Sequence, residues 1–290
     1  MLKYPLFILT SFLFSFSFAQ KPLTPVTQCK ISAPAKKMIL VAHRGDEQGF
    51  VENSSEALQS GLRSNADYVE TDIRKTKDGV FMIHHDEQTG RVTTCGAKEV
   101  KIEEATWDFL RKNCHYKGTS VGYEKINSFA ELLDMAKNAK AGLVLDVKPV
   151  IKAGDMKALA DQLLTADPKR IVIYVNDIDA QNVLWKMAKG LDPKADPKYK
   201  ALGQMTFLKI IGKASEALKN PSRYLDNEGI AFNFAEADCE TLQALRNQYP
   251  HQLLYGWTLG TPTELQAAQN VGLDGVVTSR LGDYLKFLKR

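Results

Sequence analysis

Four apolar runs of this chain carry or end in ionisable side chains of the kinds that perform acid–base and metal chemistry. The four groups are Ala42-His43-Arg44-Gly45, Glu70-Thr71-Asp72, His84-His85-Asp86 and Asp146-Val147-Lys148. An unpaired charge in an apolar core is strongly destabilising, so a core has no use for these residues. A solvated surface can hold any one of them without a function, but four successive groups favour one shared site.

Paired carboxylates indicate a metal site. Glu70 and Asp72 are two residues apart, and on a β-strand that spacing places both side chains on the same face. Adjacent carboxylates repel each other unless a positive charge neutralises them, and a divalent cation is the simplest candidate. Asp146, which we expect on the next strand but one, completes a three-carboxylate oxygen site that suits Ca²⁺ or Mg²⁺ better than zinc. The alternative is an acidic pair without a metal, salt-bridged to Arg74, Lys148 or Arg44.

The histidines indicate proton transfer. We expect His43 and one of His84 and His85 to face each other across the carboxylates. Two imidazoles beside a bound substrate suit general acid–base catalysis, one accepting a proton while the other donates one. Arg44 and Lys148 would supply positive charge for an anionic group such as phosphate. A histidine that stands alone at a strand end is more often only a hydrogen-bonding residue.

These groups need strands to position them, and apolar runs alternate with helical patterns from residue 38 onward. The nine runs cover residues 38–43, 67–73, 80–84, 142–147, 170–175, 204–210, 229–234, 252–257 and 274–279. Regular alternation favours a parallel sheet, and nine runs fit an α/β fold with a closed (β/α)₈ barrel, a TIM barrel. The surplus run is expected at 204–210 or at 229–234. A doubly wound open sheet is the alternative, but no G-x-G-x-x-G motif follows the first run.

One barrel domain is expected over residues 37–290. Catalytic residues of such barrels lie at the carboxyl ends of the strands, where the ionisable groups stand. Capping boxes predict helix starts at 53–56, 128–131 and 261–264. An irregular segment at about 87–126 is expected to be an excursion between the third strand and its helix.

The N-terminal segment is typical of a secretory signal peptide. Lys3 precedes an apolar stretch, and residues 1–19 end in Ser17-Phe18-Ala19, so we expect cleavage before Gln20. A membrane anchor is the alternative, but a span needs about 20 apolar residues. Residues 20–36 then form a Pro- and Lys-rich leader. The mature chain is expected to be exported, either periplasmic or secreted, and without stable membrane insertion.

Export changes how the cysteines are interpreted. Cys29, Cys95, Cys114 and Cys239 make an even count, with three possible disulfide pairings in an oxidising compartment. A local disulfide between Cys95 and Cys114 is favoured, which leaves Cys29 with Cys239. The alternative for the second pair is two buried thiols.

Composition and net charge limit the classes of partner that the chain can bind. The chain has 290 residues, of which 44% are hydrophobic and 25% charged, and a net charge of +4. These values exclude wholesale disorder and a coiled-coil rod. The mild charge gives no case for nucleic-acid binding, yet it would not repel a small anionic substrate.

The motifs together resemble those of the glycerophosphodiester phosphodiesterase family, whose pattern runs H-R-G, E-N, E-x-D, K-D-G and H-D. This chain has His43-Arg44-Gly45, Glu52-Asn53, Glu70-Thr71-Asp72, Lys77-Asp78-Gly79 and His85-Asp86 in that order. Weaker resemblance extends to the C-terminus, through 256–258 and 272–278. The resemblance implies a (β/α)₈ barrel.

The resemblance also implies roles for individual residues. His43 and His85 would be the acid–base pair, with His85 chosen over His84 because it directly precedes the aspartate. Glu70 and Asp72 would bind the metal, and Arg44 and Lys148 would lie near the phosphate.

Two positions depart from the family pattern. Asp146 stands where the family usually has Glu in an E-x-K context, and Thr278-Ser279 stands where it has T-D. Trp257 is expected either to form a wall for the glycerol or the leaving alcohol, or to pack at the rim.

The expected reaction is hydrolysis of a glycerophosphodiester to sn-glycerol 3-phosphate and an alcohol such as choline or ethanolamine. One histidine would remove the proton of a free hydroxyl beside the phosphate, and the other would protonate the leaving alcohol. Alternatives keep the barrel but change its ligand. They are a lysophospholipase D-like or phosphatidylinositol phospholipase C-like enzyme, and a non-catalytic phosphodiester-binding protein.

Overall fold

The computed structural model describes residues 25–29, 37–120, 122–221, 224 and 228–290. The expected signal peptide, its cleavage before Gln20 and the membrane-anchor alternative lie outside the described residues. Among the described helices, none combines the length and the apolar character needed to cross a bilayer.

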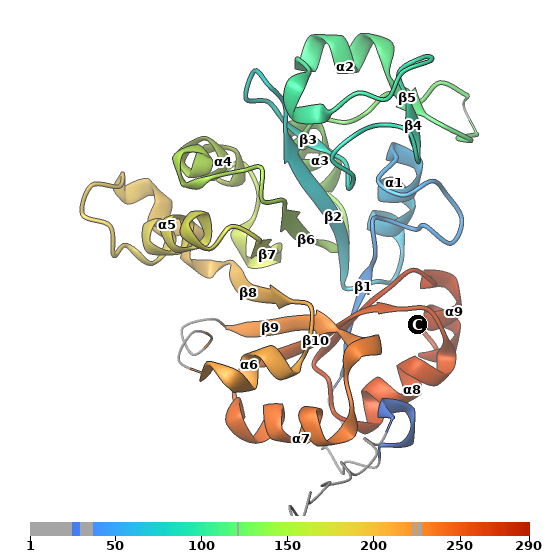
Figure 1. Ribbon diagram of the computed structural model, residues 1–290, viewed down its shortest axis with the longest axis vertical. Helices are drawn as coiled ribbons and strands as arrows, with labels where there is room; N and C mark the ends of the chain where they lie inside the picture. The colour runs from blue at the N-terminus through green and yellow to red at the C-terminus, as the bar shows by residue number, and fades with distance from the viewer. Residues whose placement is uncertain (1–24, 30–36, 121, 222–223, 225–227) are drawn as a thin grey trace, which may run out of the picture.

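Eight parallel strands form a closed barrel at the centre of the molecule (Figure 1). They are β1 (Ile39–Ala42), β2 (Tyr68–Lys75), β6 (Gly142–Val147), β7 (Ile171–Val175), β8 (Thr206–Ile211), β9 (Gly229–Asn233), β10 (Leu253–Leu259) and β11 (Gly275–Thr278). Strand β1 pairs with both β2 and β11, which closes the sheet. The expected barrel is therefore confirmed, and the open doubly wound sheet is excluded.

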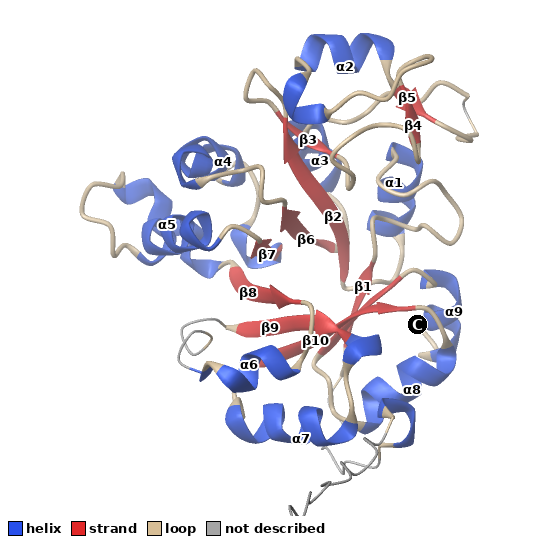
Figure 2. Ribbon diagram, in the orientation of Figure 1, coloured by secondary structure: helices blue, strands red, loops and turns tan. Residues whose placement is uncertain are grey.

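Helices surround the strands, as Figure 2 shows. They are α1 (Ser55–Arg63), α3 (Phe129–Ala136), α4 (Met156–Leu163), α5 (Ile178–Lys189), α6 (Ser215–Lys219), α7 (Cys239–Gln248), α8 (Pro262–Asn270) and α9 (Leu281–Phe287). Short 3-10 helices cover Val26–Gln28, Ile102–Glu104, Ala153–Asp155, Pro168–Arg170, Pro197–Gln204 and Phe234–Glu236. A barrel strand packs on helices outside and on other strands inside, which explains runs that are apolar on both faces.

The helix starts agree with two of the three predicted caps. Ser128 with Glu131 and Thr261 with Glu264 form complete capping boxes. The first box is wrong in detail, because Ser54 alone caps α1 by accepting from the backbone N–H of Ala57. The N-cap lies one residue later than predicted, so the N3 residue is Ala57, which has no polar side chain to return the hydrogen bond.

The ninth apolar run lies outside the barrel, which corrects the expectation for 204–210 and 229–234. Those two runs are β8 and β9, whereas 80–84 contains β3 (Phe81–Ile83), which pairs antiparallel with β2. The turn between β2 and β3 is short, and the N–H of Gly79 donates to Thr76 within it. A parallel connection needs a dozen or more residues, so this run can return only as a hairpin.

The segment between β3 and α3 builds a small unit of its own beside the barrel (Figure 1). It contains α2 (Trp107–Asn113) and a ribbon of β4 (Thr93–Thr94) with β5 (His115–Tyr116). Its apolar centre is formed by Met82, Ile102, Ala105, Leu110, Cys114, Tyr116 and Ile126. The excursion is therefore packed rather than irregular throughout.

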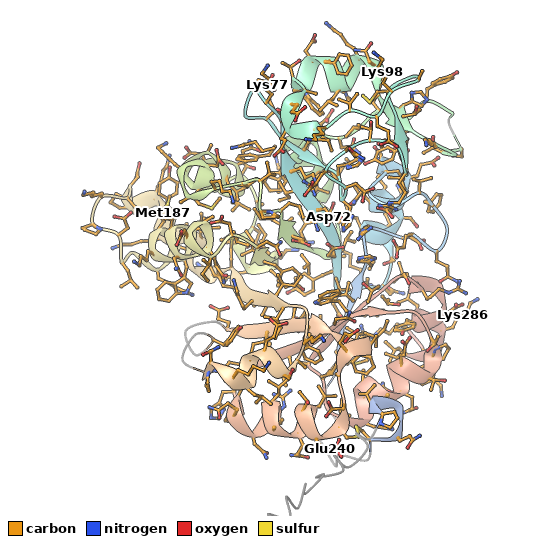
Figure 3. The ribbon with its side chains drawn as sticks, in the orientation of Figure 1. Asp72, Lys77, Lys98, Met187, Glu240 and Lys286 are labelled. Carbon is orange, nitrogen blue, oxygen red and sulfur yellow. A yellow bond between two sulfur atoms is a disulfide. The ribbon has the colours of Figure 1, made fainter. Side chains whose placement is uncertain are left out.

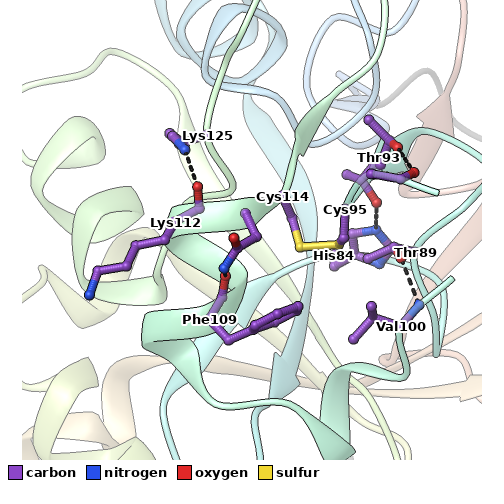
Figure 4. The surroundings of a disulfide bond; sticks show 12 residues. His84, Thr89, Thr93, Cys95, Val100, Phe109, Lys112, Cys114 and Lys125 are labelled. Carbon is purple, nitrogen blue, oxygen red and sulfur yellow. Dashed lines mark hydrogen bonds between the residues drawn. A yellow bond between two sulfur atoms is a disulfide. The ribbon is translucent and has the colours of Figure 1, made fainter. Parts of the chain in front are cut away.

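Both expected disulfides are present, and the buried-thiol alternative for the second pair is wrong. Cys95 and Cys114 join two parts of the excursion across a separation of 19 residues (Figure 4). Cys29 and Cys239 join the segment 25–29 to the start of α7 across 210 residues. Disulfides of this kind are typical of oxidising compartments.

Candidate active site

Three buried carboxylates meet at the carboxyl ends of β2 and β6. Glu70 and Asp72 are both on β2, and Asp72 is the register partner of Asp146 on β6. One ligand oxygen from each carboxylate lies within 4.8 Å of the others. Figure 3 labels Asp72 at the centre of the molecule, on β2. The expectation that another strand separates Glu70 from Asp146 is wrong, because β3 leaves the barrel and β6 becomes the direct neighbour of β2.

Two cations already stand in the carboxylate cluster. The ammonium of Lys148 lies 2.6 Å from Asp72 and 2.8 Å from Asp146. The guanidinium Nε of Arg44 lies 3.4 Å from Asp72 Oδ2. Arg74 instead donates through Nε to the backbone carbonyl of His85. Of the three cations named in the salt-bridge alternative, two are therefore present at the carboxylates and one is engaged elsewhere.

The cations do not compensate all three carboxylates equally. Burial and the negative charge of Asp72 raise the pKa of Glu70 to about 7. Burial would also raise the pKa of Asp72, but Lys148 and Arg44 hold it well below its usual range. Among the described ion pairs, Glu70 has none with a lysine or arginine side chain. The excess negative charge and the set of oxygen donors fit a hard divalent cation.

A tight loop after β1 places His43 and Arg44. The backbone N–H of His43 continues the ladder to the carbonyl of Thr278, and the N–H of Arg44 donates to Glu70. Gly45 follows with φ +90°, and a Cβ there would lie 2.5 Å from the backbone carbon of Ala57. Only glycine fits this approach between the loop and helix α1.

His43 lies between two carboxylates. Its Nδ1 is 2.8 Å from Glu47 Oε1, and its Nε2 is 4.0 Å from Glu70 Oε2. A carboxylate can only accept, so Glu47 holds the proton on Nδ1 and leaves Nε2 toward the pocket. Burial disfavours the imidazolium, but Glu47 and Glu70 outweigh it, so the pKa of His43 is raised.

His85 reaches the same pocket from the end of the β3 hairpin. Its Nδ1 lies 2.9 Å from Asp86 Oδ1, while the guanidinium of Arg91 donates through Nε to Asp86 Oδ2. Burial lowers the pKa of His85. Burial opposes ionisation of Asp86, yet Arg91 and His85 lower the pKa of Asp86 to about 2. His85 is thus oriented by a carboxylate whose charge is shared with Arg91.

His84 turns away from the pocket into the excursion. It is 1% exposed, and its Nε2 lies 3.0 Å from the hydroxyl of Thr93, beside the Cys95–Cys114 disulfide (Figure 4). Its Nδ1 lies 2.9 Å from the carbonyl of Asp86. Of the two neighbouring histidines, His85 is therefore the one that lines the pocket.

A second set of contacts ties the loops together. Glu52 accepts from Arg44 and from both terminal nitrogens of Arg91. Asn53, at φ 60°, donates to Asp72 and accepts from Thr71. Glu52 and Asn53 therefore hold Arg44 and Asp72 in place, and the excursion supplies Arg91 as a second partner of Glu52.

The eight residues expected at the site line one pocket with a volume of about 370 Å³. They are His43, Arg44, Glu70, Asp72, His85, Asp146, Lys148 and Trp257. Tyr174, Asn176, Ile210, Ile211, Gly212, Thr258 and Val277 complete its wall. Asn176 donates to Asp146, so an amide directly after β7 supports the shorter acidic side chain.

The sequence pattern does not indicate Glu47, Arg91, Tyr174 or Asn176. Each reaches the site through a loop or a neighbouring strand. Glu47 follows His43 by four residues, which is a local signal, whereas no such spacing links the other three residues to their partners.

Comparison with known proteins places the site in context. Residues 43–283 match the model of the Glycerophosphoryl diester phosphodiesterase family. A glycerophosphodiester phosphodiesterase of Caldanaerobacter subterraneus is 39% identical over 57 residues, which cover 20% of this chain and 24% of that protein's length. Glycerophosphodiester phosphodiesterase GDPD4 of Arabidopsis thaliana is 22% identical over 256 residues, which cover 83% of this chain and 70% of that protein.

The fold is also found in solved structures. A phosphodiesterase from Oleispira antarctica, in complex with the product sn-glycerol-3-phosphate, matches with a TM-score of 0.72 at 19% identity. The match covers 87% of this chain and 97% of that one. At this identity the likeness establishes the barrel fold.

Proposed function

The chain belongs to the glycerophosphoryl diester phosphodiesterase family, and we propose that it is an exported, divalent-cation-dependent glycerophosphodiester phosphodiesterase. The products would be sn-glycerol 3-phosphate and an alcohol. The observation that carries the proposal is the shared pocket, in which His43 and His85 accompany three carboxylates. The product bound to the Oleispira antarctica phosphodiesterase supports the choice of substrate class.

Glu70, Asp72 and Asp146 would hold the Ca²⁺ or Mg²⁺ ion. When bound, such an ion supplies Lewis-acid polarisation of the phosphate and of a hydroxyl beside it. Lys148 and Arg44 carry the positive charge that a phosphodiester needs. The ammonium of Lys148, shared between Asp72 and Asp146, becomes available to phosphate oxygens when those carboxylates take another partner.

The two histidines would move the protons. Nδ1 of His43 is held by Glu47 and Nδ1 of His85 by Asp86, so both present Nε2 for chemistry. One Nε2 accepts the proton of the free hydroxyl of the polyol arm, whose oxygen attacks phosphorus. The other donates a proton to the departing alcohol oxygen. Displacement of the alcohol by the hydroxyl oxygen leaves a cyclic phosphate. Water then opens this cyclic phosphate with the roles of the two histidines exchanged, which restores both of them.

Pocket size favours deacylated diesters over intact lipids. The volume of about 370 Å³ is near the lower end of small-molecule sites, which run from roughly 300 to 1,000 Å³. Trp257 would form one wall for the substrate.

Export is proposed from the N-terminal signal pattern and supported by the two disulfides. N-terminal sequencing of the chain recovered outside the cytoplasm checks this directly. A mature N-terminus at Gln20 is the expected result, and retention of residues 1–19 would contradict it.

The test of activity is release of sn-glycerol 3-phosphate from glycerophosphocholine by the purified mature chain. EDTA should abolish turnover, and Ca²⁺ or Mg²⁺ should restore it. His43→Ala and His85→Ala should each lower kcat by roughly 10²- to 10⁴-fold. His251→Ala, an exposed position outside the pocket, is the matched control.

A non-catalytic binding protein would give a different pattern. It would bind glycerophosphocholine without releasing product. His43→Ala would then change the affinity for glycerophosphocholine, and there would be no turnover to change. Unchanged turnover in His43→Ala would remove that residue from the mechanism.

A further inference from the structure

Two residues that line the pocket each carry a buried polar atom that has no partner among the described residues. The two atoms are the hydroxyl of Tyr174 and the indole Nε1 of Trp257. Tyr174 is 2% exposed, yet it lines the pocket, so it belongs to the buried end of that cavity. A buried hydroxyl without a partner destabilises the fold, whereas phenylalanine at the same place would not. The presence of the Tyr174 hydroxyl is therefore better explained by a hydrogen bond that it makes to a bound ligand.

The place of Tyr174 in the barrel indicates what that partner is. Tyr174 on β7 is the register partner of Asp146, so its side chain stands beside the carboxylate cluster. It packs in the barrel interior with Val277, and Ile210 and Trp257 lie against the same group. The pocket therefore has an ionic side and an apolar side, and Tyr174 and Trp257 lie on the apolar side.

The chemistry of the two atoms selects the ligand group. An indole N–H only donates, whereas a phenol hydroxyl donates and accepts, so a neutral hydroxyl oxygen can pair with both. A second anionic group is disfavoured here, because Tyr174, Ile210, Trp257 and Val277 offer it no positive charge. A hydrocarbon chain would leave both atoms unpaired.

We propose that the Tyr174 hydroxyl, together with the Trp257 indole N–H, binds the terminal free hydroxyl of the polyol arm of the substrate. The hydroxyl beside the phosphate gives its proton to a histidine in the proposed reaction. The terminal hydroxyl is therefore the one available to the apolar side of the pocket. Tyr174 thereby selects phosphodiesters with an unacylated polyol arm. The inference rests on the proposed function and names its specificity.

The experiment compares two substrates that differ in one hydroxyl. Glycerophosphocholine carries the terminal hydroxyl, and its propane-1,2-diol analogue lacks it but keeps the hydroxyl beside the phosphate. The wild-type chain should favour glycerophosphocholine in kcat/KM by roughly 3- to 10-fold, the value of one neutral hydrogen bond. Tyr174→Phe should lose that preference, because its kcat/KM should fall on glycerophosphocholine but not on the propane-1,2-diol analogue. Trp257→Phe, which keeps an aromatic ring without the N–H, should reduce it.

A matched tyrosine separates binding from stability. Tyr249 is also buried, but its hydroxyl donates to the carbonyl of Ala217 at 2.7 Å. Tyr249→Phe should lower Tm by about 2–4 °C and keep the arm preference. Tyr174→Phe should leave Tm unchanged or higher. A fall in Tm like that of Tyr249→Phe, or an intact arm preference, would overturn the proposal.

A binding measurement keeps this inference separate from the proposed activity. Calorimetry compares sn-glycerol 3-phosphate with its 1-deoxy analogue, using the wild-type chain and Tyr174→Phe. If the wild-type chain turns over no diester, the proposed activity fails, but this comparison still decides the role of Tyr174. A preference for sn-glycerol 3-phosphate that Tyr174→Phe removes supports the subsite. Equal binding of both ligands by the wild-type chain contradicts it.

Discussion

Each histidine of the site has its Nδ1 beside a carboxylate, but the carboxylate beside His85 also pairs with an arginine. Asp86 shares its charge with Arg91, whereas Glu47 pairs with His43 in the described structure. A carboxylate with an arginine neighbour stabilises an imidazolium less, because the two cations compete for one charge. Burial, with the charges of Lys148 and Arg44, lowers the pKa of His85, whereas Glu47 and Glu70 outweigh burial at His43 and raise its pKa.

Glu47→Gln should therefore lower kcat on the order of 10- to 100-fold with little change in KM, because it disturbs the orientation and charge of one imidazole. NMR of the imidazole nitrogens in the metal-free chain should show a lower pKa for His43. Glu104→Gln removes an exposed carboxylate that pairs with Lys101, and it is the control. A variant whose kcat is unchanged would show that Glu47 is not a positioning residue.

Protonation of Glu70 should compete with metal binding. Its pKa of about 7 is raised above the usual value, so the metal-free site holds a proton at pH 6 and has lost most of it at pH 8. A cation needs the ionised form, and the proton must leave first. Addition of Ca²⁺ or Mg²⁺ should thus raise Tm more at pH 8 than at pH 6. Equal increments at both pH values would contradict this account, and Glu70→Gln should remove the pH difference.

At the scale of elements, local patterns predict what each strand contributes but not which strands are neighbours. The spacing of Glu70 and Asp72 predicts their shared face, and the structure places both in the pocket. The apolar run at 80–84 reads like any barrel strand, and only its short distance from the preceding run distinguishes a hairpin. Tyr174 and Arg91 reach the site through tertiary packing, which no spacing in the sequence encodes.

The loop between β1 and α1 offers a test of how an element positions the site. Gly45→Ala should destabilise the chain by roughly 2–4 kcal/mol, because a positive φ and a clash with Ala57 add together. Gly79→Ala, at φ +84° with no atom within 4 Å of the new Cβ, should cost about 1 kcal/mol from the backbone alone. Urea unfolding measures both. Equal losses would show that the clash is relieved by movement of α1.

At the scale of the whole molecule, the two disulfides constrain the chain very differently. Cys95–Cys114 closes a short loop inside the excursion that carries Arg91. Cys29–Cys239 closes a loop that contains six of the eight barrel strands, all but β10 and β11. Among the described residues of the segment it anchors, Val26–Gln28 packs on α8.

These differences make removal of each disulfide informative about how it stabilises the fold. If disulfides act by restricting the unfolded chain, Cys29→Ser/Cys239→Ser should cost about 5 kcal/mol and Cys95→Ser/Cys114→Ser about 3 kcal/mol. Urea unfolding should also show a larger m-value for the first variant, because its unfolded state is freer to expand. If native contacts matter more, the order should reverse, since the excursion is the better packed of the two. In either case Cys29→Ser/Cys239→Ser should keep kcat, because every pocket residue lies beyond residue 37. Cys95→Ser/Cys114→Ser should raise KM, because it loosens the contacts of Arg91 with Glu52 and Asp86.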